Sequence, residues 1–161
     1  MIEITTKLLP TNTKRRSGLK LARVAFLVAH DTANDGATAL NNVNYYINSA
    51  NEVNASAHFF VDDKQILNCI PENEKAWHVH YGAPLDNQLY NGDANDCALG
   101  IELCYSTKGV FDSKKAYQNY VELFAYLCKK YSLDPMKHII GHYRLDPTRR
   151  SDPIDAFMKI S

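Results

Sequence analysis

Two of the six histidines stand where apolar, strand-like runs of the sequence end. His30 follows the run at 24–29, and His142 follows the short run at 139–141. Side chains at strand ends are held by the sheet yet open toward loops, so they suit a functional site. Asp152 stands in the irregular segment after His142. Two imidazoles and one carboxylate can bind zinc tetrahedrally and leave the fourth position to water, as catalytic zinc requires.

The spacing of these three residues also fits a structural interpretation. A histidine at a strand end is often a hydrogen-bonded structural residue, and a chain with six histidines and many aspartates offers such sets by chance. His138 and His142 are four residues apart, but the β-branched Ile139 and Ile140 argue against the helix that a zinc-binding pair would need. His80 and His138 belong to no recognisable motif.

The elements that would position these residues alternate between strands and helices. Continuous apolar or alternating runs predict strands, and apolar residues three and four apart predict helices. A long helix is expected up to Ser132, with Asp112 or Ser113 as its N-cap. Residues 82–96 are rich in Gly, Pro, Asn and Asp and predict a long loop. The expected strands are 24–29, 57–61, 65–70, 97–105 and 139–140, and the expected helices are 39–47, the segment up to 131 and 154–160.

This alternation predicts an α/β fold, a single-domain sandwich in which helices flank a central mixed β-sheet. The 161 residues fit one domain, 1–161, and 45% of them are hydrophobic, which suffices for a buried core. Eighteen basic residues offset eighteen acidic ones, so the chain lacks the positive charge that nucleic-acid binding needs. No nucleic-acid partner is expected, and a monomer is expected.

The cysteines and the apolar runs bear on the cellular compartment. Cys69, Cys97, Cys104 and Cys128 form no C-x-x-C pair and predict free buried thiols. No apolar run of about twenty residues exists, so no membrane insertion is expected. Lys20 and Arg23 interrupt the run at 19–29, which argues against a signal peptide. Synthesis in the cytoplasm is therefore expected.

Five segments of the sequence, taken in order, resemble a known family. Together they are similar to the type 2 N-acetylmuramoyl-L-alanine amidases, which include bacteriophage endolysins, wall-recycling enzymes and peptidoglycan recognition proteins. The similarity extends over residues 24–157, and its specificity comes from five motifs in one order. The motifs are Val-Ala-His-Asp-Thr at 28–32, Ser-Ala-His-Phe-Phe-Val-Asp at 56–62, Ala-Trp-His at 76–78, Leu-Gly-Ile-Glu-Leu at 99–103, and Gly-His at 141–142 followed by Arg-Ser-Asp-Pro at 150–153.

The resemblance implies a Zn²⁺ held by His30, His142 and Asp152, in the branch of the family that uses aspartate where many members have cysteine. It implies that Glu102 faces the reacting water, accepts its proton and returns that proton to the leaving amine. Arg150 stands where the family commonly has lysine. A cation there can stabilise the oxyanion, although the planar guanidinium changes the geometry and Arg149 competes for the role.

Three further residues are candidates for contact with the substrate. His58 lies in an alternating strand pattern and either faces the site or is a partly exposed strand residue. Trp77 and His78 resemble the family's loop beside the peptide stem, but the only tryptophan of the chain is equally suited to core packing.

The resemblance implies hydrolysis of the amide between N-acetylmuramic acid and L-alanine in peptidoglycan. We expect a phage endolysin or autolysin domain that acts on the cell wall after release, and a muropeptide-recycling amidase is the alternative. A catalytically silent peptidoglycan-binding module is the rival from another class, because fold alone does not decide function. A full ligand set together with Glu102 favours the enzyme.

Overall fold

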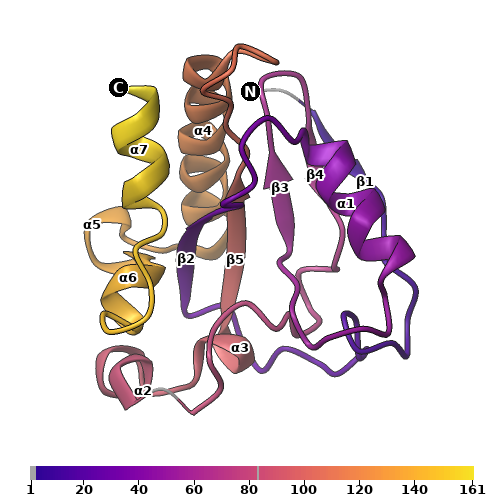
Figure 1. Cartoon of the computed structure of the whole chain (residues 1–161). Helices are drawn as coiled ribbons and strands as arrows, with labels where there is room; N and C mark the ends of the chain where they lie inside the picture. Colours follow the sequence, from indigo (N-terminus) through magenta and orange to yellow (C-terminus); the bar gives the residue numbers. More distant parts are fainter. Residues whose placement is uncertain (1–2, 83) are drawn as a thin grey trace.

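A six-stranded mixed β-sheet forms the centre of the molecule (Figure 1). The computed structural model describes residues 3–82 and 84–161. The strand order is β1-β4-β3-β5-β2-β6, and of these neighbours β3 and β4 alone are antiparallel. The strands are β1 (Ile4–Thr6), β2 (Phe26–Asp31), β3 (Phe59–Val61), β4 (Ile66–Asn68), β5 (Ala98–Leu103) and β6 (Ile139–Gly141). The predicted α/β fold with a central mixed sheet is confirmed.

Strands β2 and β5 pair in parallel near the middle of the sheet and hold the candidate site residues His30 and Glu102. All six residues of β2 are buried, as expected for a continuous apolar run covered on both faces. Their register places His30 opposite Glu102, and β6 pairs in parallel on the other side of β2. The carboxyl ends of β2, β5 and β6 therefore lie at one edge of the sheet, where open α/β sheets bind their ligands.

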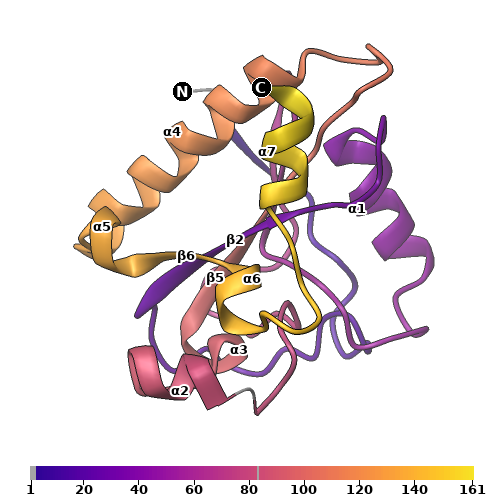
Figure 2. The same ribbon diagram turned by 60° about the vertical axis from the view of Figure 1, so that its left-hand side comes forward.

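Helices cover both faces of the sheet (Figure 2). Helix α1 (Ala39–Asn48) lies on one side and is capped by Thr38, whose side chain accepts from the Asn41 N–H. Helix α4 (Ser113–Tyr131) lies on the other side, and α7 (Ile154–Ile160) lies beside α4. One core cluster contains residues from α1, α4, α7 and the sheet, so burial of apolar side chains holds the layers together.

Helix α4 follows the sequence prediction closely. The Asp112 side chain caps it by accepting from the Lys115 N–H at 3.0 Å, and Ser132 ends it in the left-handed conformation. Two apolar residues on the same side of the helix as its buried residues are partly open, because Tyr117 is 40% and Val121 is 47% exposed. The apolar face of α4 is therefore wider than the surface that the sheet covers.

The segment at 82–96 differs from its prediction as one long loop. It contains α2 (Pro84–Tyr90) and leads into α3 (Ala94–Cys97), which Asp93 caps through the Asn95 N–H. Two more short helices flank β6, namely α5 (Pro135–His138) and α6 (His142–Leu145). These helices are one or two turns long, too short for apolar periodicity to reveal them.

The four cysteines are free and buried, as predicted. In the part of the chain that the structure describes, no helix combines the length and apolar character needed to cross a membrane.

Candidate metal centre and pocket

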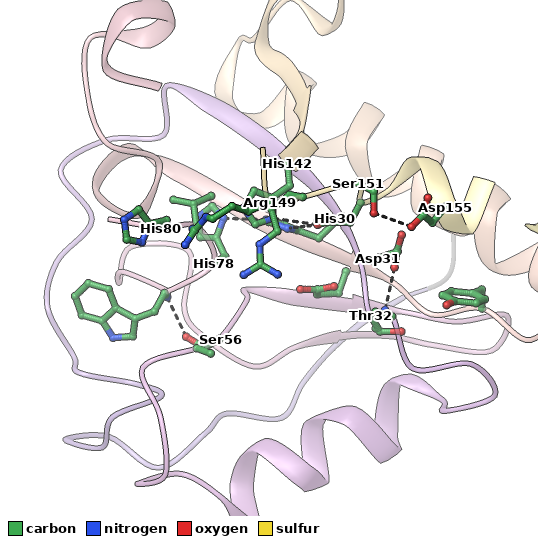
Figure 3. Close-up of a pocket in the computed structure, with 18 of the residues that line it drawn as sticks. His30, Asp31, Thr32, Ser56, His78, His80, His142, Arg149, Ser151 and Asp155 are labelled. Atoms are coloured by element: carbon green, nitrogen blue, oxygen red, sulfur yellow. Dashed lines mark hydrogen bonds and ion pairs between the residues drawn. The ribbon is translucent and has the colours of Figure 1, made fainter. Parts of the chain in front are cut away.

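A pocket of about 530 Å³ opens at the carboxyl edge of strands β2 and β5 (Figure 3). The buried histidines lie at its base, and cationic and aromatic side chains surround the opening. Its lining includes His30, Asp31, Tyr46, Asn54, Ser56, Trp77, His78, His80, Glu102, Tyr105, His142, Arg149, Arg150, Ser151, Asp152, Asp155 and Lys159. Of the eight site residues predicted from the sequence, only His58 does not line this pocket.

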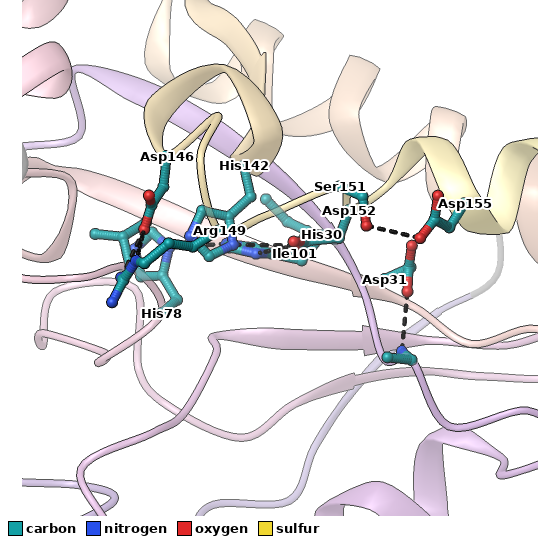
Figure 4. A network of polar contacts seen from close by, with 12 residues as sticks. His30, Asp31, His78, Ile101, His142, Asp146, Arg149, Ser151, Asp152 and Asp155 are labelled. Carbon is teal, nitrogen blue, oxygen red and sulfur yellow. Dashed lines mark hydrogen bonds and ion pairs between the residues drawn. The ribbon is translucent and has the colours of Figure 1, made fainter.

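The three predicted metal ligands converge on one point (Figure 4). Oδ2 of Asp152 lies 2.9 Å from Nδ1 of His30 and 3.1 Å from Nδ1 of His142. One ligand atom from each of the three residues lies within 4.8 Å of the others. Both imidazoles are buried, while the Asp152 carboxylate is partly open. The fold thus brings together residues that are up to 122 positions apart in the sequence.

This donor set fits zinc. Imidazole nitrogen and carboxylate oxygen are both ordinary zinc ligands, and three protein ligands leave one position open. The His30 imidazole is suited to be a neutral ligand, because burial lowers its pKa to about 4. Burial opposes ionisation of Asp152, yet hydrogen bonds from His142 and His30 hold the pKa of its carboxyl below the usual value.

Backbone contacts fix the strand and the loop that carry the ligands. The hydroxyl of buried Tyr120 on α4 donates to the carbonyl of His30 at 2.9 Å. The Tyr143 N–H donates to the carbonyl of Asp152 at 3.0 Å. These bonds come from α4 and α6, so the helices on both sides of the strand determine where the ligands lie.

Asp31 connects strand β2, which holds His30, to helix α7, which follows Asp152. Residue type and spacing alone indicate no role for Asp31. Its buried carboxylate accepts from the Ala33 N–H at 2.9 Å and from the Ala156 N–H of α7 at 3.4 Å. The strand with His30 is thereby tied to the helix that follows Asp152. The available signal was its position next to His30 in the first motif.

Glu102 lies in the pocket without a partner for one carboxyl oxygen. Its Oε2 is buried and accepts no hydrogen bond from the described residues. Burial, reinforced by the negative charges of Asp152 and Asp31, raises the pKa of Glu102 well above the usual value. A carboxyl group with a raised pKa is suited both to accept and to return a proton near neutral pH.

The two candidate arginines differ in their contacts. Nε and Nη2 of Arg149 donate to Oδ2 of Asp146 at 2.8 and 2.6 Å, so this guanidinium is already paired. Arg150 is exposed, and its side chain makes no hydrogen bond or ion pair with any residue in the described ranges. Burial dominates the pKa shifts of His30 and Glu102, and the positive charge of Arg150 lowers both pKa values.

Trp77 and His78 both line the pocket, in different ways. Trp77 is half-buried, its backbone N–H donates to Oγ of Ser56 at 3.1 Å, and its ring packs edge-on against Tyr81. It is therefore not a core residue and offers an aromatic surface to the pocket. The His78 imidazole is buried beneath the opening and contacts His30 instead of solvent.

His58 does not face the pocket, which corrects the prediction that it contacts the substrate. Its imidazole is fully buried, Nε2 donates to the Glu74 carbonyl at 2.9 Å, and Nδ1 accepts from the Gly100 N–H at 3.0 Å. Both ring nitrogens are thus used by the backbone, and neither remains for a ligand. The bonds of His58 tie β5 to a segment far away in the sequence, so its role is structural.

Comparison with known proteins places the chain in a family. A family model described as N-acetylmuramoyl-L-alanine amidase matches residues 20–155. The chain is 37% identical over 146 residues to N-acetylmuramoyl-L-alanine amidase CwlL of Bacillus licheniformis, a match that covers 89% of this chain and 40% of that protein. It is also 37% identical to N-acetylmuramoyl-L-alanine amidase BlyA of Bacillus subtilis, over 95% of this chain and 42% of the relative.

The fold comparison agrees. A solved structure described as a mutant endolysin from Bacillus subtilis superposes with a TM-score of 0.77 at 28% identity and covers 100% of both chains. The chain thus spans about two fifths of the length of the curated relatives but the whole of this solved chain.

Proposed function

The chain belongs to the N-acetylmuramoyl-L-alanine amidase family, and from this membership we propose that it hydrolyses the amide bond between N-acetylmuramic acid and L-alanine in peptidoglycan. The single observation that carries the proposal is the convergence of His30, His142 and Asp152 beside the buried carboxyl of Glu102. A module that only binds peptidoglycan needs no such combination of ligand set and acid.

The ligand set is proposed to hold one zinc ion. A bound zinc supplies Lewis acidity and lowers the pKa of water toward neutrality. The contribution of the protein is to present the two imidazoles and the carboxylate on rigid supports, namely strand β2, helix α6 and the loop before α7. Tyr120 and Asp31 restrain these supports through the hydrogen bonds described above.

Glu102 is proposed to move the proton. Hydrolysis of an amide requires a base to accept a proton from the attacking water and an acid to protonate the leaving nitrogen, and one carboxyl group can do both in turn. Glu102 is the acidic side chain on β5, and it lines the pocket directly across from His30. In this scheme its free Oε2 faces the reacting water.

Arg150 is proposed to stabilise the oxyanion that forms on the scissile carbonyl. A fixed positive charge at that oxygen lowers the energy of the transition state more than that of the ground state. Arg150 is better suited than Arg149, because Asp146 already neutralises Arg149. Trp77 is proposed to pack against the substrate along the wall of the pocket.

The biological role that we propose is that of an endolysin catalytic domain. The supporting observation is the match over the full length of a solved endolysin structure. The substrate is then intact cell-wall peptidoglycan, reached after the protein is released from the cytoplasm.

Digestion of purified peptidoglycan tests the proposed activity. We expect the zinc-loaded protein to release new L-alanine amino termini, and mass spectrometry of the products to show intact sugar chains separated from intact stem peptides. If the protein binds peptidoglycan with zinc present but releases no amino termini, the activity is wrong and the domain is a binding module. Cleavage within the peptide or between the sugars would equally contradict the proposed bond.

A further inference from the structure

The imidazole of His30 has a partner on each of its two ring nitrogens (Figure 4). Nδ1 faces Oδ2 of Asp152 at 2.9 Å, on the side where the metal ligands converge. Nε2 faces Nδ1 of His78 at 3.1 Å, and the two rings lie edge to face. His78 is therefore a neighbour of the metal centre that supplies no atom to it.

A metal ligand must present a lone pair, so Nδ1 of His30 carries no proton when it binds zinc. The proton of the neutral ring is then on Nε2, and a buried N–H needs an acceptor. Nδ1 of His78 is the atom that the described structure places within hydrogen-bonding distance of this N–H. Such contacts to the second nitrogen of a ligand histidine fix its tautomer and its orientation.

We propose that His78 is a positioning residue for the metal centre, whose Nδ1 accepts the Nε2–H of His30 and holds that ring in the zinc-binding tautomer and orientation. This inference rests on the proposed zinc site and goes beyond it. Contact of His78 with the substrate stays a prediction beside it, because His78 also lines the pocket. The role requires that His78 itself be held firmly.

Two neighbours hold His78 in place. The buried Asn95 side chain accepts from the N–H groups of His78 and Val79 at 2.9 and 3.1 Å and donates to the Val79 carbonyl at 3.0 Å. Asn95 thereby fixes the backbone at both residues. The ring itself lies against Gly100 of β5, where an added Cβ would be 2.6 Å from Cγ of His78.

Because Gly100 has no side chain, the His78 ring fits between β5 and His30. His58, which accepts from the Gly100 N–H, fixes this same point of the strand. His58 and His78 thus both contact β5 at Gly100, and their rings lie edge to face.

The test compares two substitutions that differ in where they place a polar group. In His78→Asn the side-chain oxygen occupies the position of Nδ1, whereas in His78→Gln the amide reaches the position of Nε2. We expect zinc affinity, measured by competition with a chromogenic chelator, to fall by about 10- to 100-fold in His78→Gln and in His78→Leu. In His78→Asn it should stay within about threefold of wild type, because the acceptor is restored.

The tautomer provides a readout that does not depend on activity. Two-bond ¹H–¹⁵N correlation spectra of the zinc-loaded protein should show His30 protonated at Nε2 in wild type and His78→Asn, and should show exchange broadening or a new shift in His78→Gln. Circular dichroism shows which variants are folded, and the Asn and Gln pair alone decides the question if His78→Leu does not fold. If wild type binds zinc and all folded variants bind it equally, the positioning role is wrong while the amidase proposal stands. If wild type binds no zinc, both fall.

Discussion

His30 on β2 and Glu102 on β5 are register partners in adjacent parallel strands. Residues in register on neighbouring strands point to the same face of a sheet, about 4.8 Å apart at the backbone. The proposed metal ligand and the proposed proton carrier are thus fixed relative to each other by backbone hydrogen bonds, with no loop between them. This rigidity is what a catalytic pair requires, because small misplacements of reacting groups reduce rates strongly.

The first prediction concerns Glu102. The variant Glu102→Gln should retain its fold, its zinc and its binding to peptidoglycan, because glutamine is nearly isosteric with glutamate. Its turnover should fall by roughly 100-fold or more, the scale of general acid–base catalysis. Release of L-alanine amino termini measures the rate.

A matched control is Glu52→Gln, which makes the same chemical change at an exposed residue outside the pocket lining. Its turnover should equal that of wild type. Should Glu102→Gln cleave at the normal rate, the amidase assignment survives but the proton carrier must be another group.

The second prediction concerns the metal. Elemental analysis of the purified protein should give one zinc per chain, and removal of the zinc by a chelator should abolish cleavage until zinc is restored. The variant His142→Ala should lose stoichiometric zinc, because two ligands and water hold the ion much less firmly than three. His138→Ala is the matched control, since His138 bonds only to the backbone of Asp134 among its described contacts. Wild-type zinc affinity in His142→Ala would show that the ligand assignment is wrong.

The sequence predicts most of the fold because strands β2 and β5, which hold His30 and Glu102, lie in long apolar runs. The patterns predict strand β2 and helix α4, and residue type predicts Asp112 or Ser113 as the cap of α4, of which Asp112 is the cap in the structure. No pattern predicts strand β1. It has three residues, two of them exposed, and it pairs with β4 more than sixty positions away, so no local pattern indicates it.

The sequence indicates the three proposed ligands more fully than the contacts that support them. His30 and His142 follow strands and Asp152 belongs to a recognisable motif, whereas supporting contacts join a side chain to backbone groups elsewhere in the fold. The bonds of His58 to Glu74 and Gly100 and those of Asn95 to His78 are of this kind. Residue type and spacing carry no information about such partners, so the sequence indicates neither the structural role of His58 nor a role for Asn95.

The third prediction concerns the thiols. Burial raises the pKa of Cys97 to about 11 and raises those of the other three thiols too, so the reactive thiolate is scarce at neutral pH. We expect the native protein to react slowly with a thiol reagent at pH 8 and to show four reactive thiols once it is unfolded. Each single Cys→Ala variant that folds should keep its zinc. Loss of zinc in any of them would overturn the choice of Asp152 as the third ligand.

The last prediction separates the two adjacent arginines. Arg150 lines the pocket with a guanidinium free of hydrogen bonds and ion pairs to described residues, whereas that of Arg149 is bonded to Asp146. If Arg150 stabilises the oxyanion, Arg150→Ala should lower kcat by roughly 100-fold with little change in zinc content, as expected for loss of one oxyanion contact. Arg149→Ala removes the same charge and side chain one position earlier, and the loss of its exposed ion pair should cost little stability. Its kcat should therefore stay close to wild type.

Arg150→Lys adds a further comparison, because it keeps the charge and replaces the planar fork with an ammonium group. If charge alone matters, this variant recovers most of the rate, and if the fork is needed, it remains slow. Equal losses in Arg149→Ala and Arg150→Ala would contradict the assignment and indicate that the two arginines act only through the electrostatic potential of the pocket.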